Sequence, residues 1–300
     1  MYDPVIGSYE YIQEQVVAYP FVEENNNMIG LNKSYIAKLK GLHQSCGYED
    51  YIKTYLTFPA SGVQPVTPEI SDECGINSLV ELASLRVNPC FNSYEINTQC
   101  KSVSVYNNLR LIVTGPMPSD PLGFPTDLAS SYPLLTPLYF DRDDVKKAMH
   151  APTGVSWEEC SGPVFVGDGD QSLDPIQSVL PKVIEKTQRV LVGNGDFDMV
   201  IITAGTLLAI QNMTWGGTLG FQQQPEKDIV ITLPDLQYAQ VFADNGLAGY
   251  QDPQGTMGVQ HFERGLMWAE TFLSGHMVPQ FQPRSSYRHL QWVLGHIEEL

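Results

Sequence analysis

Two segments constrain the fold of this 300-residue chain more than any other feature. Residues 189–201 read Arg-Val-Leu-Val-Gly-Asn-Gly-Asp-Phe-Asp-Met-Val-Ile, and residues 273–279 read Leu-Ser-Gly-His-Met-Val-Pro. Each has apolar residues beside a loop of small residues that presents an ionisable side chain, Asp198 in the first and His276 in the second. Open α/β sheets place their functional sites in such loops, at the carboxyl ends of the strands.

Helical and strand patterns surround the first segment. Residues 176–184 carry apolar side chains at helical spacing behind Asp174, a predicted N-cap, and Pro175, suited to the first helical position. Pro181 is expected to kink this helix. Residues 190–192 then form a short apolar run typical of a buried parallel strand, and residues 199–210 are predicted to be the next helix.

The last part of the chain predicts two strands and a helix. Residues 259–264 and 265–273 could pair as strands, although the second stretch could equally be helical. A final helix is expected to begin at Pro283. Its predicted apolar face consists of Tyr287, Leu290, Val293 and Leu294.

The two halves of the chain differ in character. Residues 1–135 are less regular, with helical patterns at 9–19 and 34–42 and a cluster of cysteines, and we expect them to form a cap or insertion region. Residues 136–300 carry the regular helix and strand patterns and are expected to form an α/β core.

The charge balance excludes some classes of partner. Asp and Glu outnumber Lys and Arg by 34 to 17, for a formal net charge of −17, which argues against a nucleic-acid partner because phosphate neutralisation requires clustered cations. No apolar run approaches the roughly 18 residues that a membrane span needs, so no membrane partner is expected. The chain begins without a basic segment and an apolar core, and no secretory signal is visible.

Five cysteines and two glycosylation sequons indicate an oxidising compartment. Cys46, Cys74, Cys90 and Cys100 lie in one polar stretch and suggest two local disulfides, for which three connectivities are possible. Cys160 stands apart; it is either a buried free thiol or a half-cystine whose partner lies on sequence outside this chain. The sequons are at the two asparagines Asn32 and Asn212.

Neither a metal nor a cofactor is expected. The cysteines lack the C-x-x-C spacing of zinc sites. The acidic stretch 168–172 does not fit a calcium-binding loop, because Leu173 stands where that loop needs glycine and Val179 where it needs glutamate.

Asp198 and His276 fit two roles of a Ser-His-Asp hydrolase. The acid accepts the imidazole Nδ1–H and fixes the tautomer, and the histidine then takes the serine proton through Nε2. In the α/β-hydrolase chain order the acid precedes the histidine, as it does here. An alternative is that Asp196 and Asp198 are turn residues and His276 a loop histidine, and spacing alone does not choose between the two aspartates.

The nucleophile of such a triad is not found. No serine has glycine at both positions of a G-x-S-x-G turn. The nearest approaches are Gly7-Ser8 and Gly154-Val155-Ser156, and Glu158 stands at the second glycine position of the latter. One donor of the oxyanion hole belongs to that turn, so it is absent with the serine.

These motifs resemble those of the serine carboxypeptidases, particularly the secreted fungal type. The acid motif 193–198 and the histidine motif 275–279 carry the resemblance, and further similar segments are found at 2–4, 140–152, 157–160 and 212–217. The resemblance implies a partial α/β-hydrolase fold with a helical, disulfide-containing cap, and secretion or a vacuolar location. It also implies that Asp198 is the triad acid, His276 the base and Met277 a substrate contact, and that Cys160 bridges to an amino-terminal half.

The function expected from the resemblance is release of carboxyl-terminal residues from peptide or protein substrates through an acyl-enzyme. Because the serine segment is missing, we expect these 300 residues to be inactive alone, as the carboxyl-terminal portion of such an enzyme. Two alternatives stay open: a non-catalytic binding protein derived from the fold, and one chain of a two-chain enzyme joined through Cys160.

Overall fold

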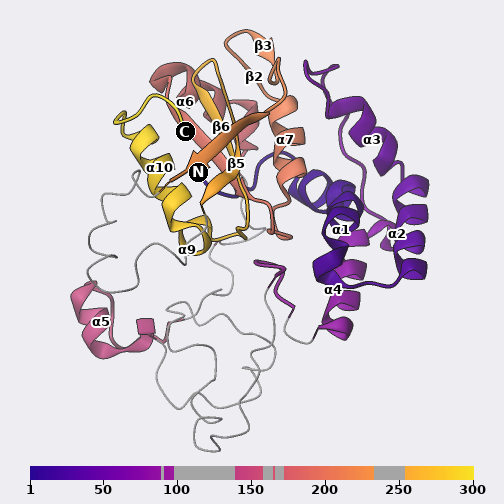
Figure 1. Cartoon of the computed structure of the whole chain (residues 1–300), viewed down its shortest axis with the longest axis horizontal. Coiled ribbons are helices and arrows are strands. Elements are labelled where there is room, and N and C mark those ends of the chain that lie inside the picture. The colour runs from indigo at the N-terminus through magenta and orange to yellow at the C-terminus, as the bar shows by residue number, and fades with distance from the viewer. Residues whose placement is uncertain (89–90, 98–138, 158–164, 166–171, 233–253) are drawn as a thin grey trace, which may run out of the picture. The chain divides into compact units, whose positions relative to one another are not determined.

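The computed structural model describes residues 1–88, 91–97, 139–157, 165, 172–232 and 254–300 (Figure 1). The chain divides into two compact units. One consists of Met1–Ala83, Ser93–Asn97 and Leu173–Leu300, and the other of Ser84–Asn92 and Thr98–Ser172. The predicted division into residues 1–135 and 136–300 stays a prediction, because the residues around that boundary lie outside the described part of the chain.

A four-stranded mixed sheet lies at the centre of the first unit, as an α/β fold requires. Its order is β1 (Val190–Gly195), β6 (Leu266–Thr271), β5 (Gly255–Glu263) and β4 (Lys227–Ile231). β1 and β6 are parallel and in register from Val190 opposite Leu266 to Gly195 opposite Thr271, whereas the β6–β5 and β5–β4 pairs are antiparallel. A separate two-stranded sheet pairs β2 (Thr214–Trp215) with β3 (Thr218–Leu219).

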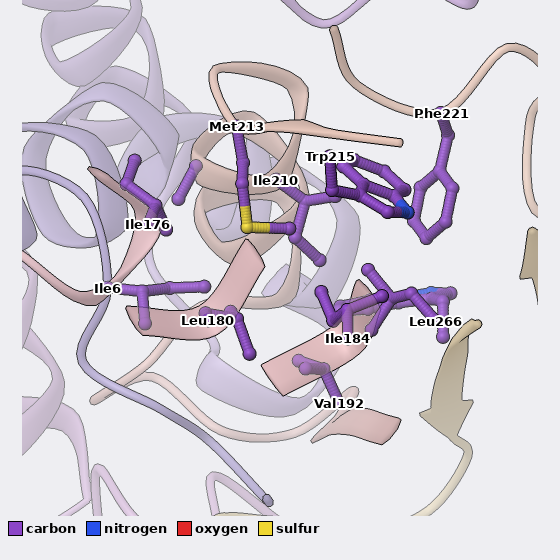
Figure 2. Close-up of a cluster of buried hydrophobic side chains, with 12 residues drawn as sticks. Ile6, Ile176, Leu180, Ile184, Val192, Ile210, Met213, Trp215, Phe221 and Leu266 are labelled. Carbon is purple, nitrogen blue, oxygen red and sulfur yellow. The ribbon is translucent and has the colours of Figure 1, made fainter. Parts of the chain in front are cut away.

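Helices cover both faces of the sheet. Val192, Leu266 and Trp268 point to the face covered by α6 (Val179–Thr187) and α7 (Thr203–Gln211), where the buried cluster of Figure 2 forms. The next residues along each strand point to the opposite face, where α10 (Pro283–Val293) packs through Trp292. This alternation follows from the two-residue period of a β-strand, and it explains why β1 is apolar on both sides.

The amino-terminal residues of this unit are mostly helical (Figure 1). They form a π-helical turn, η1, then α1, α2, α3 and a short 3₁₀ turn, η2, and α4 begins at residue 76. The bounds are Tyr9–Gln15, Val16–Ile29, Lys33–Ser45, Tyr48–Tyr55 and Asp72–Cys74, with Ile76–Val87 for α4. A disulfide joins Cys46 at the end of α2 to Cys74 in η2. Both predicted helices of this region are therefore confirmed, and so is one of the possible disulfide pairs.

The second unit contains a short helix among its described residues. A 3₁₀ turn, η3 (Tyr139–Asp141), leads into α5 (Asp143–Ala148). The buried Lys146 ammonium pairs with the Asp141 carboxylate at 2.6 Å, and the same carboxylate accepts the backbone N–H of Trp157. Cys90, Cys100 and Cys160 lie outside the described residues.

The predicted helix at residues 176–184 is interrupted. Asp174 accepts the Ile176 N–H and caps a 3₁₀ turn, η4 (Pro175–Gln177), but Ser178 takes φ −154° and α6 begins only after it. Pro181 consequently lies in the first turn of α6, where its missing N–H removes no helical hydrogen bond. The expected kink is replaced by this earlier break. Residues 265–273, which could have been helix or strand, supply β6.

The final helix is confirmed, but its predicted face is wrong. Leu290 and Leu294 are 50% and 57% exposed, whereas the buried positions of α10 include His289 and Trp292. His289 accepts or donates a 2.9 Å hydrogen bond with the Tyr2 hydroxyl, and burial lowers the pKa of His289 to about 3. The buried contacts of polar side chains, which apolar spacing does not report, orient this helix.

No helix among the described residues is both long and apolar enough to cross a bilayer.

Candidate active site

The parallel pairing of β1 and β6 brings the two predicted residues together. Because β1 ends at Gly195 and β6 at its register partner Thr271, the loops after both strands leave the sheet at the same edge. Asp198 lies on the first loop and His276 on the second. The Nδ1 atom of His276 is 2.8 Å from Oδ2 of Asp198, a hydrogen bond between side chains 78 positions apart in sequence.

Asp198 is fully buried and held by three donors. Its Oδ1 atom accepts the backbone N–H groups of Val200 at 2.7 Å and Ile201 at 3.2 Å, while Oδ2 faces His276. Burial raises the pKa of the Asp198 carboxyl group, and the hydrogen bonds from His276 and the two backbone groups oppose that rise. Donors of this kind stabilise a buried carboxylate and fix the direction of its second oxygen.

Asp196 makes a different contact from Asp198. Its Oδ1 atom accepts the backbone N–H of Ser274 at 3.1 Å and thereby ties the loop after β1 to the loop after β6. Burial raises the pKa of Asp196 to about 6. The geometry separates the two aspartates that sequence spacing could not, since Asp198 is the one that accepts the hydrogen bond from the imidazole.

The two loops also touch through their backbones. The N–H of Phe197 donates to the Ser274 carbonyl at 2.8 Å, and that of Asp196 donates to the Thr271 carbonyl at 3.1 Å. A Cβ atom added at Gly195 would lie 2.3 Å from the Ser274 carbonyl oxygen. The glycine between Asn194 and Asp196 is therefore required for this close approach.

A third segment, Ser93–Asn97, holds both loops and was not predicted. The Ser93 carbonyl accepts the N–H of Met199 at 2.9 Å, and the Tyr94 carbonyl accepts the N–H of His276 at 2.8 Å. The Tyr94 ring also meets the imidazole edge to face, with centroids 5.3 Å apart. These contacts fix the backbone on either side of the Asp198–His276 pair.

Glu95 in the same segment is a buried acid. It accepts the backbone N–H of Gly275, and its exposed fraction is 4%. Burial, together with the smaller effect of the nearby charges of Asp196 and Asp198, raises the pKa of Glu95 to about 8. The sequence did not predict that Glu95 is buried at this site, because a single glutamate in a polar stretch usually lies on the surface.

Asp3 is the second unpredicted carboxyl group at this site. One carboxyl oxygen of Asp3, one of Asp198 and one ring nitrogen of His276 lie within 4.8 Å of one another. These residue types can ligate metals, but the Asp198 and His276 atoms that face each other are already joined by a hydrogen bond. A hydrogen bond therefore already joins two members of this cluster, and the Asp3 carboxyl group lies beside them.

The buried acids predict that stability falls as the pH rises above neutrality. The pKa values of Glu270, Glu95 and Asp3 are raised to about 7, 8 and 9, chiefly by burial. A group with a raised pKa binds more protons in the folded than in the unfolded state. Its stabilising contribution is present below its ordinary pKa and is lost as the pH rises through its folded pKa. Over the pH range in which the folded state holds the proton and the unfolded state does not, each such group lowers the free energy of unfolding by about 1.4 kcal/mol per pH unit.

The effect should be measured from about pH 6.5 to about pH 8, where the three acids with raised pKa values outweigh the opposite slope of the single Met1 ammonium group, whose pKa burial lowers. Burial lowers the pKa values of His43 and His289, so these histidines are neutral in both states above the ordinary histidine value of 6.5 and add no slope there. Urea unfolding at a series of pH values should show the decline, and Glu95→Gln should make it shallower. A flat or rising profile would contradict the assignment of these protons.

The other predicted site residues are placed as follows. Met277 is half-buried and precedes α9 (Val278–Phe281). Asn32 is exposed and caps α2, with Oδ1 accepting the N–H of Tyr35 at 2.9 Å. Asn212 is half-buried, and its Oδ1 accepts the N–H of Gln64 at 2.8 Å. Substrate contact by Met277 and glycosylation of the two asparagines stay predictions.

Comparison with known proteins identifies the family of the chain. The family described as serine carboxypeptidase matches residues 20–296. The chain is 52% identical over its whole length to serine-type carboxypeptidase F of Aspergillus niger, of which it covers 55%, and 37% identical to a probable serine carboxypeptidase of Arthroderma benhamiae, of which it covers 52%. The chain thus spans about half the length of the curated relatives it matches.

A solved structure supports the fold. Kex1(delta)p, a prohormone-processing carboxypeptidase from Saccharomyces cerevisiae, aligns with 98% of this chain and 53% of its own at a TM-score of 0.56 and 18% identity. That identity shows a shared α/β-hydrolase type of fold and nothing finer. The family match over most of the chain and the 52% identity to a curated member show that the chain belongs to the serine carboxypeptidase family.

Proposed function

We propose that Asp198 and His276 are the acid and base of a serine-type hydrolysis of carboxyl-terminal peptide bonds. The observation that carries this is their 2.8 Å hydrogen bond at the carboxyl edge of two parallel strands. The family membership of the chain and the names of its relatives support this reaction class.

The proposed roles follow from the geometry of the imidazole. Donation of Nδ1–H to Asp198 leaves Nε2 unprotonated and able to take the proton of an attacking serine. The buried carboxylate then stabilises the imidazolium while the serine oxygen bonds to the scissile carbonyl carbon. His276 returns the proton to the leaving amine, and a water activated in the same way releases the acyl group. Met277, next to the base, is placed against the substrate.

The serine is assigned to sequence other than these 300 residues. No G-x-S-x-G turn occurs in the chain, and the chain spans about half of its relatives. We place the oxyanion donors and the disulfide partner of Cys160 on that sequence too. The Cys46–Cys74 disulfide supports an oxidising location, secreted or vacuolar.

A fusion tests this proposal. This chain, joined to the part of the Aspergillus niger relative that it does not cover, should release the carboxyl-terminal residue of an N-blocked dipeptide. The 300-residue chain alone should release none. Turnover by the chain alone that His276→Ala abolishes would show that the nucleophile lies within it. A folded fusion that binds the dipeptide without hydrolysing it would refute the assigned roles.

A further inference from the structure

The main chain of residues 1–3 carries Asp3 to the edge of the sheet where the site lies. The Met1 carbonyl accepts the N–H of Gly193 at 3.0 Å, and the N–H of Asp3 donates to the Gly193 carbonyl at 2.8 Å, so this segment runs parallel to β1. Asp3 is 7% exposed. Its Oδ1 atom accepts the N–H of Gly195 at 3.3 Å, and Oδ2 is buried with no N–H donor among the described residues.

The approach of Asp3 to Asp198 favours a proton on one of the two carboxyl groups. One carboxyl oxygen of each lies within 4.8 Å of the other, both side chains are buried, and two negative charges that share a buried site destabilise each other. Asp198 has three donors, from His276 and two backbone groups, whereas Asp3 has one long one, from Gly195. The negative charge is therefore better stabilised on Asp198, which leaves the proton on Asp3.

The charges around Asp3 agree with this placement. Burial, and next the charge of Asp198, raise the pKa of Asp3 to about 9. The hydrogen bond from Gly195 and the Met1 ammonium group act in the opposite direction but are smaller. His276 faces the same cluster and donates to Asp198, so its proton is not available to Asp3.

We propose that Asp3 is a positioning residue, which keeps its carboxyl proton and donates it to Asp198 so that Asp198 stays ionised and aimed at His276. The role in the reaction rests on the proposed function of the Asp198–His276 pair. Asp3 takes no part in the proton transfer at Nε2 of His276; it sets the ionisation state and direction of the Asp198 carboxylate, which accepts the Nδ1–H of His276.

Carbon-13 NMR of the 300-residue chain tests the proton directly. The Asp3 Cγ resonance should stay at the position of a protonated carboxyl from about pH 5 to about pH 8, below its pKa of about 9. Titration of that resonance near the ordinary aspartate value would overturn the proposal. This measurement needs no activity, so it stands apart from the test of the proposed function.

Two variants test the donor. Asp3→Asn keeps a donor, because its amide oxygen can accept from Gly195 while its NH₂ group faces Asp198. Asp3→Gly removes the donor, and glycine tolerates the φ of 43° found at this position. In NMR spectra of the 300-residue chain, the proton resonance of the His276 Nδ1–H should persist in the Asp3→Asn variant. In the Asp3→Gly variant it should weaken or move upfield. Asp196→Asn, on the same loop as Asp198, is the control and should leave that resonance in place.

In the active fusion, Asp3→Gly should lower kcat about tenfold or more with KM nearly unchanged, the scale of one lost hydrogen bond to a charge. Asp3→Asn should restore most of the rate. Equal losses in both variants would show that Asp3 is not a donor, and so would no loss in either. An inactive fusion whose chain still shows a protonated Asp3 would refute the proposed function but leave the Asp3 proton established.

Discussion

Asp198→Asn is expected to lower kcat of the fusion by about 10⁴ with little change in KM. The asparagine can present its NH₂ group to Nδ1 of His276 at the place where Asp198 Oδ2 now accepts. The imidazole would then carry its proton on Nε2, and Nε2 could no longer accept the serine proton. A steady-state assay with an N-blocked dipeptide would measure this loss.

Two controls separate this effect from damage to the loop. His276→Ala should cost at least as much, about 10⁶ in kcat, because the base itself is removed. Asp196→Asn, which removes a carboxylate that accepts the Ser274 N–H and leaves Asp198 bonded to the imidazole, should lower kcat by less than about tenfold. An Asp196 variant as impaired as the Asp198 variant would reverse the assignment of the two aspartates.

Gly275→Ala is expected to destabilise the chain by about 3 kcal/mol or more. A Cβ atom at this position would lie 1.9 Å from the Tyr94 carbonyl oxygen and 2.9 Å from the Glu95 Cα atom. Both are main-chain atoms, so side-chain rotation cannot relieve the overlap. The segment that holds His276 would have to move, and urea unfolding should show the loss directly.

Gly41→Ala is the matched control for that variant. Gly41 lies within α2, and no atom other than its neighbours lies within 4 Å of the position its Cβ would take. Alanine should stabilise this helix by about 0.5–1 kcal/mol. If both alanine variants behaved alike, the close packing between residues 93–97 and the His276 loop would be wrong.

The meeting of Asp198 with His276 could be predicted in part, because neighbouring parallel strands end at the same edge of a sheet. The apolar run at 190–192 predicted a strand before Asp198, whereas the stretch before His276 could have been strand or helix; the structure makes it β6, the parallel neighbour of β1. The choice of Asp198 over Asp196 followed from the family resemblance and not from spacing, since it depends on which side chain turns toward Nδ1 and which toward the Ser274 N–H.

Other features depend on contacts between distant parts of the chain that local patterns do not report. Asp3 and Glu95 each reach the site through backbone hydrogen bonds to residues far away in sequence, namely Gly193 and Gly275. The orientation of α10 likewise follows the contact of its His289 with Tyr2 rather than its own apolar period. Periodicity predicts elements, but it does not predict which polar groups a tertiary contact will bury.

The anchoring of Met199 and His276 by carbonyls of Ser93 and Tyr94 also has a kinetic consequence. Three regions separated by long intervening stretches must meet before the acid and base can face each other, so the pair has a high contact order. Large chain loops must close first, and their entropy is lost before these few hydrogen bonds form. The pair should accordingly be assembled only after His276 has left the ribosome, among the latest parts of the protein to mature.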